Sequence, residues 1–234
     1  MLVNLTIYWF TSESLVMRKV KKQSGFTLVE IAIVLVIIGL LLGGVLKGQE
    51  LIESSKIKSM ANDLKSISSA VASYQERYRA VPGEDSTTAN TTYNARGWTG
   101  TFAGTVTKDS LIGDGTAGAI FTTPGVENLL AVQALRAGGF ITGDSTKAAL
   151  PTNAAGGAFN LGHSVFGFVG QNVVCYSGLS GKQAGALDRQ LDDGFSHSGL
   201  IRSAIETIPA DEVAAANSIP YAEDKSGFVL CKVL

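Results

Sequence analysis

The chain carries a long apolar run close to its N-terminus. Residues Phe26 to Leu46 include a single charged side chain, that of Glu30. Built as an α-helix, the run is about 30 Å long, which matches the hydrocarbon core of a bilayer. A basic cluster precedes it, made of Arg18, Lys19, Lys21 and Lys22. The pattern predicts a transmembrane helix over 26–46 that crosses the membrane once, with the N-terminus in the cytoplasm and residues from Lys47 onward carried across.

A second pattern continues this helix. Apolar residues recur every three or four positions at Ile57, Met60, Ala61, Leu64, Ile67, Val71, Tyr74 and Tyr78. Pro82 and Gly83 then end the helix. The two patterns together predict one helix over 26–79, about 80 Å long at about 1.5 Å per residue. Its second half, 47–79, is amphipathic and is expected to pack on a globular part.

The rest of the chain, 80–234, predicts a globular head of mixed structure. Residues 85–125 are rich in Thr, Gly, Asn and Ser and indicate a long loop region. A short helix is predicted over 127–136, and short strands are predicted over 164–169, 172–175, 199–202 and 227–233. The predicted fold class is therefore α+β, with a long N-terminal helix packed on a head that contains a small antiparallel sheet.

Composition and charge exclude several classes of function. With 45% hydrophobic and 17% charged residues the chain is too apolar for disorder, and a net charge of −1 makes a nucleic-acid partner unlikely. Two cysteines and two histidines are too few for a Cys/His zinc cluster. His197 lies between Ser196 and Ser198, but adjacency does not build a catalytic triad. We therefore expect that the protein is not an enzyme.

The segment Lys21-Lys22-Gln23-Ser24-Gly25 followed by Phe26-Thr27-Leu28-Val29-Glu30-Ile31 resembles the prepilin signal of bacterial type IV pilins and type II secretion pseudopilins. The resemblance implies that residues 1–25 are a leader, which begins at Met1 or at Met17. It implies cleavage after Gly25 by a prepilin peptidase of the inner membrane, which also methylates the new amino group of Phe26. Mature subunits of this family stack into helical filaments with the apolar helices at the axis.

In this family Glu30 would pair with the amino group of Phe26 in a neighbouring subunit, which offsets the cost of a carboxylate at the edge of the membrane. The alternative is that Glu30 only reaches the lipid headgroups. The implied partners are copies of the chain, the peptidase, an inner-membrane assembly platform, and lipid before assembly. The implied location is the inner membrane, and then a periplasmic or extracellular filament.

Three functions remain open on the sequence. The first is a structural subunit of a type IV pilus-like filament. The second is a pseudopilin of a type II secretion system. The third is a minor pilin whose head is an adhesin or an uptake module, which a deep pocket in the head would favour.

The head offers two further candidate sites. Cys175 and Cys231 are the only cysteines, and beyond the membrane they would meet an oxidising compartment, so we expect a disulfide that bounds the C-terminal region. Two buried free thiols are the alternative. Oxygen ligands for Ca²⁺ could come from Asp109, Asp114, Asp192 and Asp193, although Asp-Gly is first of all a turn signal. We expect no other cofactor.

Overall fold

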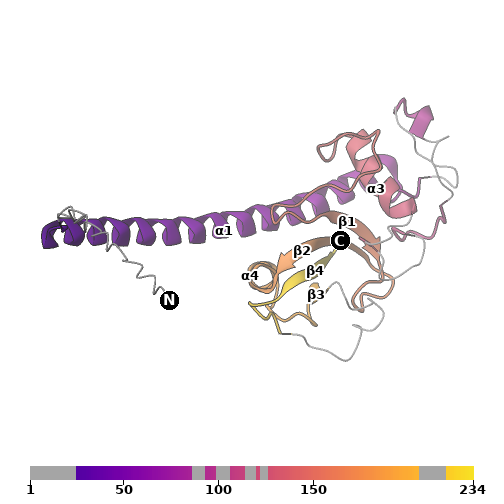
Figure 1. Cartoon of the computed structure of the whole chain (residues 1–234). Coiled ribbons are helices and arrows are strands. Elements are labelled where there is room, and N and C mark those ends of the chain that lie inside the picture. The colour runs from indigo at the N-terminus through magenta and orange to yellow at the C-terminus, as the bar shows by residue number, and fades with distance from the viewer. Residues whose placement is uncertain (1–24, 86–92, 99–105, 114–119, 122–125, 206–219) are drawn as a thin grey trace, which may run out of the picture. The chain divides into compact units, whose positions relative to one another are not determined.

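The computed structural model describes residues 25–85, 93–98, 106–113, 120–121, 126–205 and 220–234. The chain divides into two compact units, Met1–Gly48 and Gln49–Leu234, which are described separately. The elements follow in the order α1 (Leu28–Tyr78), α3 (Val126–Ala137), β1 (Phe159–His163), β2 (Asn172–Ser180), α4 (Gly181–Leu191), β3 (Ile201–Ile205) and β4 (Ser226–Val233) (Figure 1). The α+β fold class is confirmed.

The first unit holds the apolar part of α1. Every large apolar side chain from Leu28 to Leu46 is exposed in the isolated chain. Among the residues that the structure describes, α1 is the one helix long and apolar enough to cross a membrane. The predicted continuous helix over 26–79 is confirmed, since α1 begins at Leu28 and ends at Tyr78.

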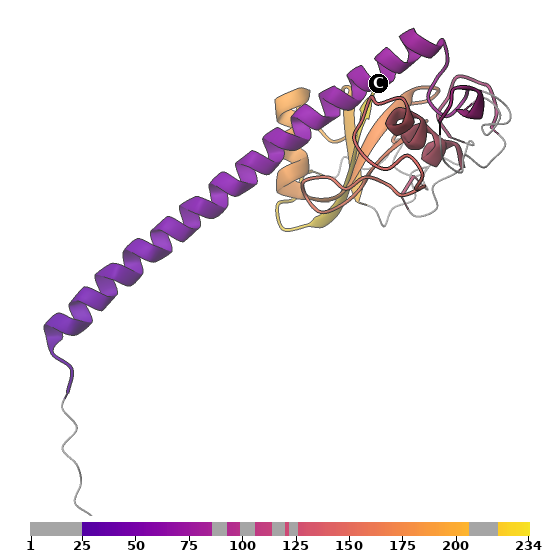
Figure 2. The same ribbon diagram turned by 90° about the horizontal axis from the view of Figure 1, so that it is seen from above.

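The second unit is built on a four-stranded antiparallel sheet with the strand order β1-β2-β4-β3. The last part of α1 packs on one face of this sheet, and the two lie side by side in Figure 1 and in the turned view of Figure 2. Its buried side chains are Met60, Ala61, Leu64, Ile67, Ala70, Val71 and Tyr74, nearly the set that the periodicity predicts. The amphipathic half of the helix is therefore confirmed as a core element.

Strand alternation separates two apolar clusters. Val174 and Tyr176 of β2 join the main core with α1 and α4, whereas Val173 and Cys175 join a smaller cluster on the other face. That smaller cluster also includes Val165, Phe166 and Phe168 from the connection between β1 and β2.

The predicted strand over 164–169 is wrong. These residues form turns between β1 and β2, in which Ser164 and Phe166 adopt positive φ angles of 54° and 50°. The apolar side chains of Val165, Phe166 and Phe168 are buried in the second cluster, so the apolar pattern reflects this burial and not strand pairing. Arg202 of β3 holds this connection, since it donates to the Phe166 carbonyl at 3.0 Å and stacks on Phe168.

Helix α4 was not predicted. Its N-terminus is a capping box, in which the Ser180 hydroxyl accepts from the Gln183 backbone N–H and the Gln183 side chain accepts from the Ser180 backbone N–H. The helix packs closely on the segment before β4, where a Cβ at Gly185 would come within 2.9 Å of Tyr221. The bounds of α3 and β4 lie within one residue of the predicted bounds, and those of β3 lie two and three residues from them.

Asp85 ties the end of α1 to the segment that follows. Its carboxylate accepts from the hydroxyls of Tyr74 and Tyr93 at 2.7 and 2.8 Å and pairs with Arg96 at 2.6 Å. The Asp85 side chain is fully buried. The Arg96 guanidinium also lies over the Tyr78 ring, 4.2 Å from its centroid.

Candidate functional site

The start of α1 is a capping box. The Thr27 hydroxyl accepts from the Glu30 backbone N–H at 3.2 Å, and the Glu30 carboxylate accepts from the Thr27 backbone N–H at 2.8 Å. The Thr27 hydroxyl also donates to the same carboxylate oxygen at 2.8 Å. The arrangement satisfies N–H groups that the first helical turn otherwise leaves without a partner.

The three residues predicted to act in processing and assembly, Gly25, Phe26 and Glu30, lie at the start of α1. Gly25 and Phe26 precede the helix in irregular backbone, and the Phe26 side chain is 83% exposed. Glu30 lies in the first turn, where the positive end of the helix dipole favours a carboxylate. Phe26 lies one residue before Thr27, whose side chain caps the helix.

Sequence reasoning missed the contribution of Thr27. The signal was present, because Thr-x-x-Glu directly before an apolar run is typical of a capping box. Glu30 thus has a partner within its own chain, which neither sequence interpretation of this residue had included.

The predicted disulfide is present. Cys175 and Cys231 are bonded, and no free cysteine occurs in the chain. Both residues are fully buried in the smaller apolar cluster, on the face of the sheet away from α1. The alternative of two free thiols is therefore wrong. The bond closes a loop that contains α4 and β3.

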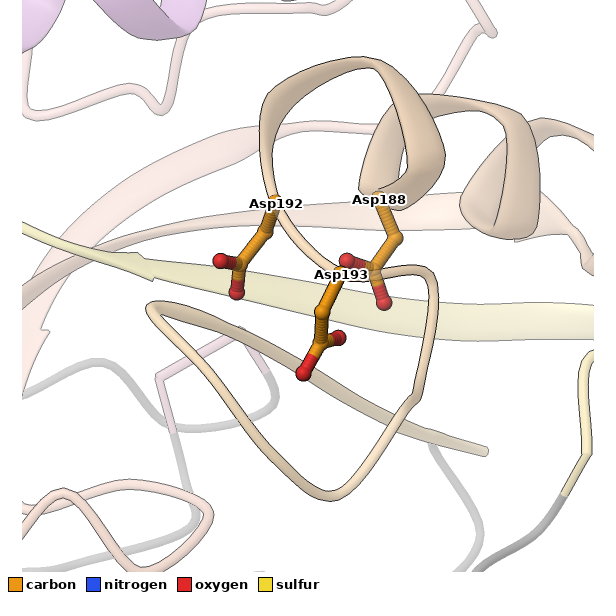
Figure 3. A group of neighbouring side chains, drawn as sticks. All are labelled: Asp188, Asp192 and Asp193. Atoms are coloured by element: carbon orange, nitrogen blue, oxygen red, sulfur yellow. The ribbon is translucent and has the colours of Figure 1, made fainter.

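Two of the four acidic candidates for calcium, Asp192 and Asp193, lie together, and Asp109 does not join them. Asp192 and Asp193 lie beside Asp188, with one carboxylate oxygen of each within 4.8 Å of the others (Figure 3). Asp188 comes from the last turn of α4 and the other two from the residues after it. Asp109 is not in this group, and Asp114 lies outside the described residues.

Protein donors already serve these carboxylates. Asp188 accepts from the Tyr221 hydroxyl and the Gly194 N–H, Asp193 from Ser198 and Phe195, and Asp192 from the Ile201 N–H. Burial raises the pKa of Asp188, and the neighbouring Asp193 and Asp192 raise it further against the hydrogen bonds from Tyr221 and Gly194. Carboxylates are the oxygen donors that Ca²⁺ prefers, and calcium binding by Asp192 and Asp193 stays a prediction.

Because Ser198 donates to Asp193, its hydroxyl is not directed to His197 as a nucleophile would be.

Asp109 takes part in a different arrangement. The Glu84 carboxyl is 4% exposed, accepts from the Ser110 N–H at 2.8 Å, and shares a hydrogen bond with Asp109. Burial and this bond raise the pKa of Glu84 to about 8. The raised pKa of Glu84 and the lowered pKa of Asp109 favour a proton on Glu84 rather than on Asp109.

Comparison with known proteins bears on the N-terminal region. Residues 20–46 match the family model of the prokaryotic N-terminal methylation motif. This motif is the signature of the prepilin signal of type IV pilins and pseudopilins, so the resemblance noted from Lys21 to Ile31 is confirmed. No curated protein and no solved structure matches the chain.

Proposed function

We propose that this chain is a structural subunit of a type IV pilus-like filament that assembles from the bacterial inner membrane. One observation carries the proposal. The methylation motif over 20–46 leads into a helix whose large apolar side chains from Leu28 to Leu46 are all exposed in the isolated chain. Burying one such side chain is worth about 1.5–3 kcal/mol, so this surface must be covered. Lipid covers it before assembly, and the helices of other copies cover it in the filament.

Processing prepares the subunit for assembly. A prepilin peptidase cuts after Gly25 and methylates the amino group of Phe26, and the apolar helix stays attached to the head. The Thr27 cap holds the Glu30 carboxylate at the start of α1, where the Phe26 amino group of a neighbouring copy can reach it. Because that cation exists only after cleavage, unprocessed chains lack the partner for Glu30. An inner-membrane platform then adds mature subunits to the filament.

The same motif also serves pseudopilins, whose filaments remain in the periplasm. We place this protein with the pilus-like subunits. A type II secretion pseudopilin and a minor pilin with a binding head are the competing assignments. The location of the filament distinguishes a pilus-like subunit from a pseudopilin. Pilus filaments can be sheared from the cell surface, whereas a pseudopilus stays behind the outer membrane.

The test is expression in a bacterium with and without its prepilin peptidase. With the peptidase, we expect the chain to lose residues 1–25 and to enter a sheared high-molecular-mass fraction. Without it, the precursor should stay in the membrane fraction. A cleaved chain that never enters filaments in cells with a working assembly platform would refute the structural role. Filaments found only in the periplasm would assign the chain to a pseudopilus.

A further inference from the structure

The second unit contains a cavity of about 350 Å³ between α1 and the β1 edge of the sheet. Its volume is within the range of about 300–1,000 Å³ typical of small-molecule sites. Parts of the chain that are far apart in the sequence form its wall, namely α1, the segment after α3, the turn before β1, and the strands β1 and β2. The wall combines apolar side chains with exposed hydroxyl groups.

Two aromatic side chains belong to the apolar part of the wall. Phe140 and Phe159 line the cavity and are half-buried. Phe159 of β1 is directly opposite Tyr176 of β2, with ring centroids 6.0 Å apart. Phe140 makes an edge-to-face contact with Tyr74, whose ring centroid lies 5.6 Å away. Both rings are therefore held in place by buried tyrosines of the main core.

Hydroxyl groups form most of the polar part. Ser66 of α1, Thr142 and Thr152 line the cavity and are exposed to solvent. Within the part of the chain that the structure describes, no hydrogen bond engages these three hydroxyls. Asp63, also exposed, is the only charged residue among the described residues of the wall. These groups bind water in the free protein and are available to a ligand that can replace it.

The turn that carries Thr152 is already fixed in the free chain. The buried side chain of Asn153 donates to the Ser177 carbonyl at 2.9 Å and accepts from the Gly157 N–H at 3.0 Å. It makes two further hydrogen bonds to the backbone of the same turn. The wall therefore does not have to form when a ligand arrives, which lowers the entropic cost of binding.

The chemistry of the wall restricts the ligand. Asp63 disfavours an anion, and no Lys or Arg occurs among the described residues of the wall. One carboxylate supplies too few ligands for a divalent metal ion. A purely apolar body would remove water from the hydroxyls without replacing its hydrogen bonds. A neutral sugar matches both parts of the wall, because its ring carries C–H groups on its faces and hydroxyls around its edge.

We propose that this cavity binds one residue of a neutral sugar. The C–H groups of the sugar ring carry partial positive charge and lie against Phe140 and Phe159, whose π-systems attract them. The sugar hydroxyls exchange hydrogen bonds with the three hydroxyls of the wall, since each can donate and accept, and they donate to the Asp63 carboxylate. This inference goes beyond the proposed function, because the site lies within the second unit and requires no filament.

Such a sugar could be free in solution or could be the end of a glycan on another molecule. The test is isothermal titration of the full processed chain in an alkyl polyoxyethylene detergent, which contains no sugar. The probes are glucose, galactose, mannose and N-acetylglucosamine, and the methyl glycoside of each. Because the end of a glycan is substituted at its anomeric oxygen, binding of a methyl glycoside identifies a glycan end. Binding of the unsubstituted sugar alone identifies a free sugar.

Three comparison ligands define the specificity. We expect one site per chain, and at least one sugar that binds at least tenfold more tightly than its uronate, which adds a negative charge to the same ring. The same sugar should bind at least tenfold more tightly than cyclohexanol, an apolar ring with a single hydroxyl. It should also bind more tightly than N-acetyl-leucine amide, which represents a polypeptide partner.

Matched variants locate the binding. Ser66→Ala and Thr142→Val each remove one hydroxyl of the wall and should weaken sugar binding about two- to tenfold, the worth of one hydrogen bond. Phe159→Leu keeps an apolar side chain without the ring and should weaken binding at least fivefold. Ser69→Ala removes an exposed hydroxyl from the same helix outside the cavity and should leave the affinity unchanged. Near-UV circular dichroism checks that each variant keeps its fold.

Several outcomes would overturn the proposal. No binding of any of these sugars at millimolar concentration would do so, as would cyclohexanol or the uronate binding as tightly as the sugar. Tighter binding of N-acetyl-leucine amide would assign the cavity to a polypeptide instead. If Ser66→Ala and Thr142→Val both behave like Ser69→Ala, the sugar binds elsewhere on the chain.

Discussion

Cys175 of β2 and Cys231 of β4 are directly opposite residues in neighbouring strands, with Cα atoms 4.0 Å apart, and a disulfide joins them. The bond lies on the face of the sheet that α1 does not cover. It therefore links the two central strands of the order β1-β2-β4-β3 and closes a loop that spans 56 positions of the sequence. Helix α4 and strand β3 fall within that loop.

Loss of this bond should destabilise the head substantially. We expect the double variant Cys175→Ala/Cys231→Ala to lose about 4 kcal/mol of unfolding free energy, because the unfolded chain gains the freedom of the opened loop. Denaturant unfolding followed by circular dichroism measures the loss, and reduced wild-type protein should behave like the variant. Thiol titration of the denatured, unreduced protein should find no free thiol, and two free thiols would contradict the bond.

Processing should leave Phe26 as the first residue. Intact-mass analysis of assembled material is expected to find a chain that begins with N-methyl-phenylalanine. Gly25→Trp should leave the precursor uncut in the membrane, because a bulky side chain prevents the peptidase from approaching the backbone. Ser24→Ala, a small change one residue earlier, is the control and should be cut normally. Assembled chains that begin at Met1 or Met17 would refute the cleavage site.

The cap at the start of α1 should matter for assembly. Thr27→Val keeps the shape of the side chain but removes both hydroxyl bonds to Glu30, at a cost of about 1 kcal/mol to the first turn. We expect this variant to be cut normally and to give fewer filaments, whereas Thr27→Ser should resemble the wild type. Quantifying the sheared fraction against total mature chain tests this.

Glu30→Leu tests the role of the carboxylate apart from that of the Thr27 cap, because the variant keeps the bond from the backbone N–H of residue 30 to the Thr27 hydroxyl. It should insert and be cut normally, since an apolar side chain is cheaper in the membrane, yet give a much lower filament yield. A normal filament yield from Glu30→Leu would show that the Glu30 carboxylate is not needed for assembly, even if Thr27→Val gives fewer filaments.

Local sequence patterns were sufficient to predict the features that depend on residues close together in the sequence. The spacing from Ile57 to Tyr78 predicts α1 because apolar residues recur every three or four positions and mostly polar or charged residues lie between them. The signal around Gly25, Phe26 and Glu30 is equally local, and it could be read from adjacent residues. The disulfide followed from the presence of two cysteines and the expected compartment.

Tertiary contacts explain what the patterns did not predict. Gly181 and Gly185 lower the helix propensity of α4, but a Cβ at either would collide with the segment before β4, so the fold selects glycine there. Because α4 was missed, Asp188 was missed as the neighbour of Asp192 and Asp193. The cavity at Asp63 combines α1 with β1 and β2, which no local pattern brings together.

Asp85 should be among the most sensitive positions of the head. Asp85→Ala leaves the hydroxyls of Tyr74 and Tyr93 and the Arg96 guanidinium without their acceptor, and we expect a loss of about 3–5 kcal/mol in unfolding free energy. Asp144→Asn changes an exposed carboxylate and should cost less than about 1 kcal/mol. Thermal unfolding of both variants at one pH provides the comparison, and equal midpoints would contradict the anchoring role of Asp85.

The buried carboxyl of Glu84 should make the stability of the head depend on pH. Burial, the hydrogen bond to Asp109 and the charges of Glu127 and Asp109 raise its pKa from 4.5 to about 8, against the bond from the Ser110 N–H. Below pH 4.5 the folded and unfolded chains both hold the proton, and the stabilisation is complete. As the pH rises towards 8, the folded chain binds more protons than the unfolded chain, so stability falls.

Glu84→Gln isolates this effect, because the amide keeps an acceptor for Ser110 and a donor for Asp109 at every pH. Wild type and variant should be similarly stable at pH 4.5, and the variant should be more stable at pH 9. One pKa unit corresponds to about 1.4 kcal/mol, so the difference should exceed about 1 kcal/mol, or about 2–4 °C in midpoint. Thermal unfolding of the two chains across this range measures it, with Glu76→Gln as the exposed control. Parallel pH profiles for wild type and Glu84→Gln would show that Glu84 is ionised in the folded head.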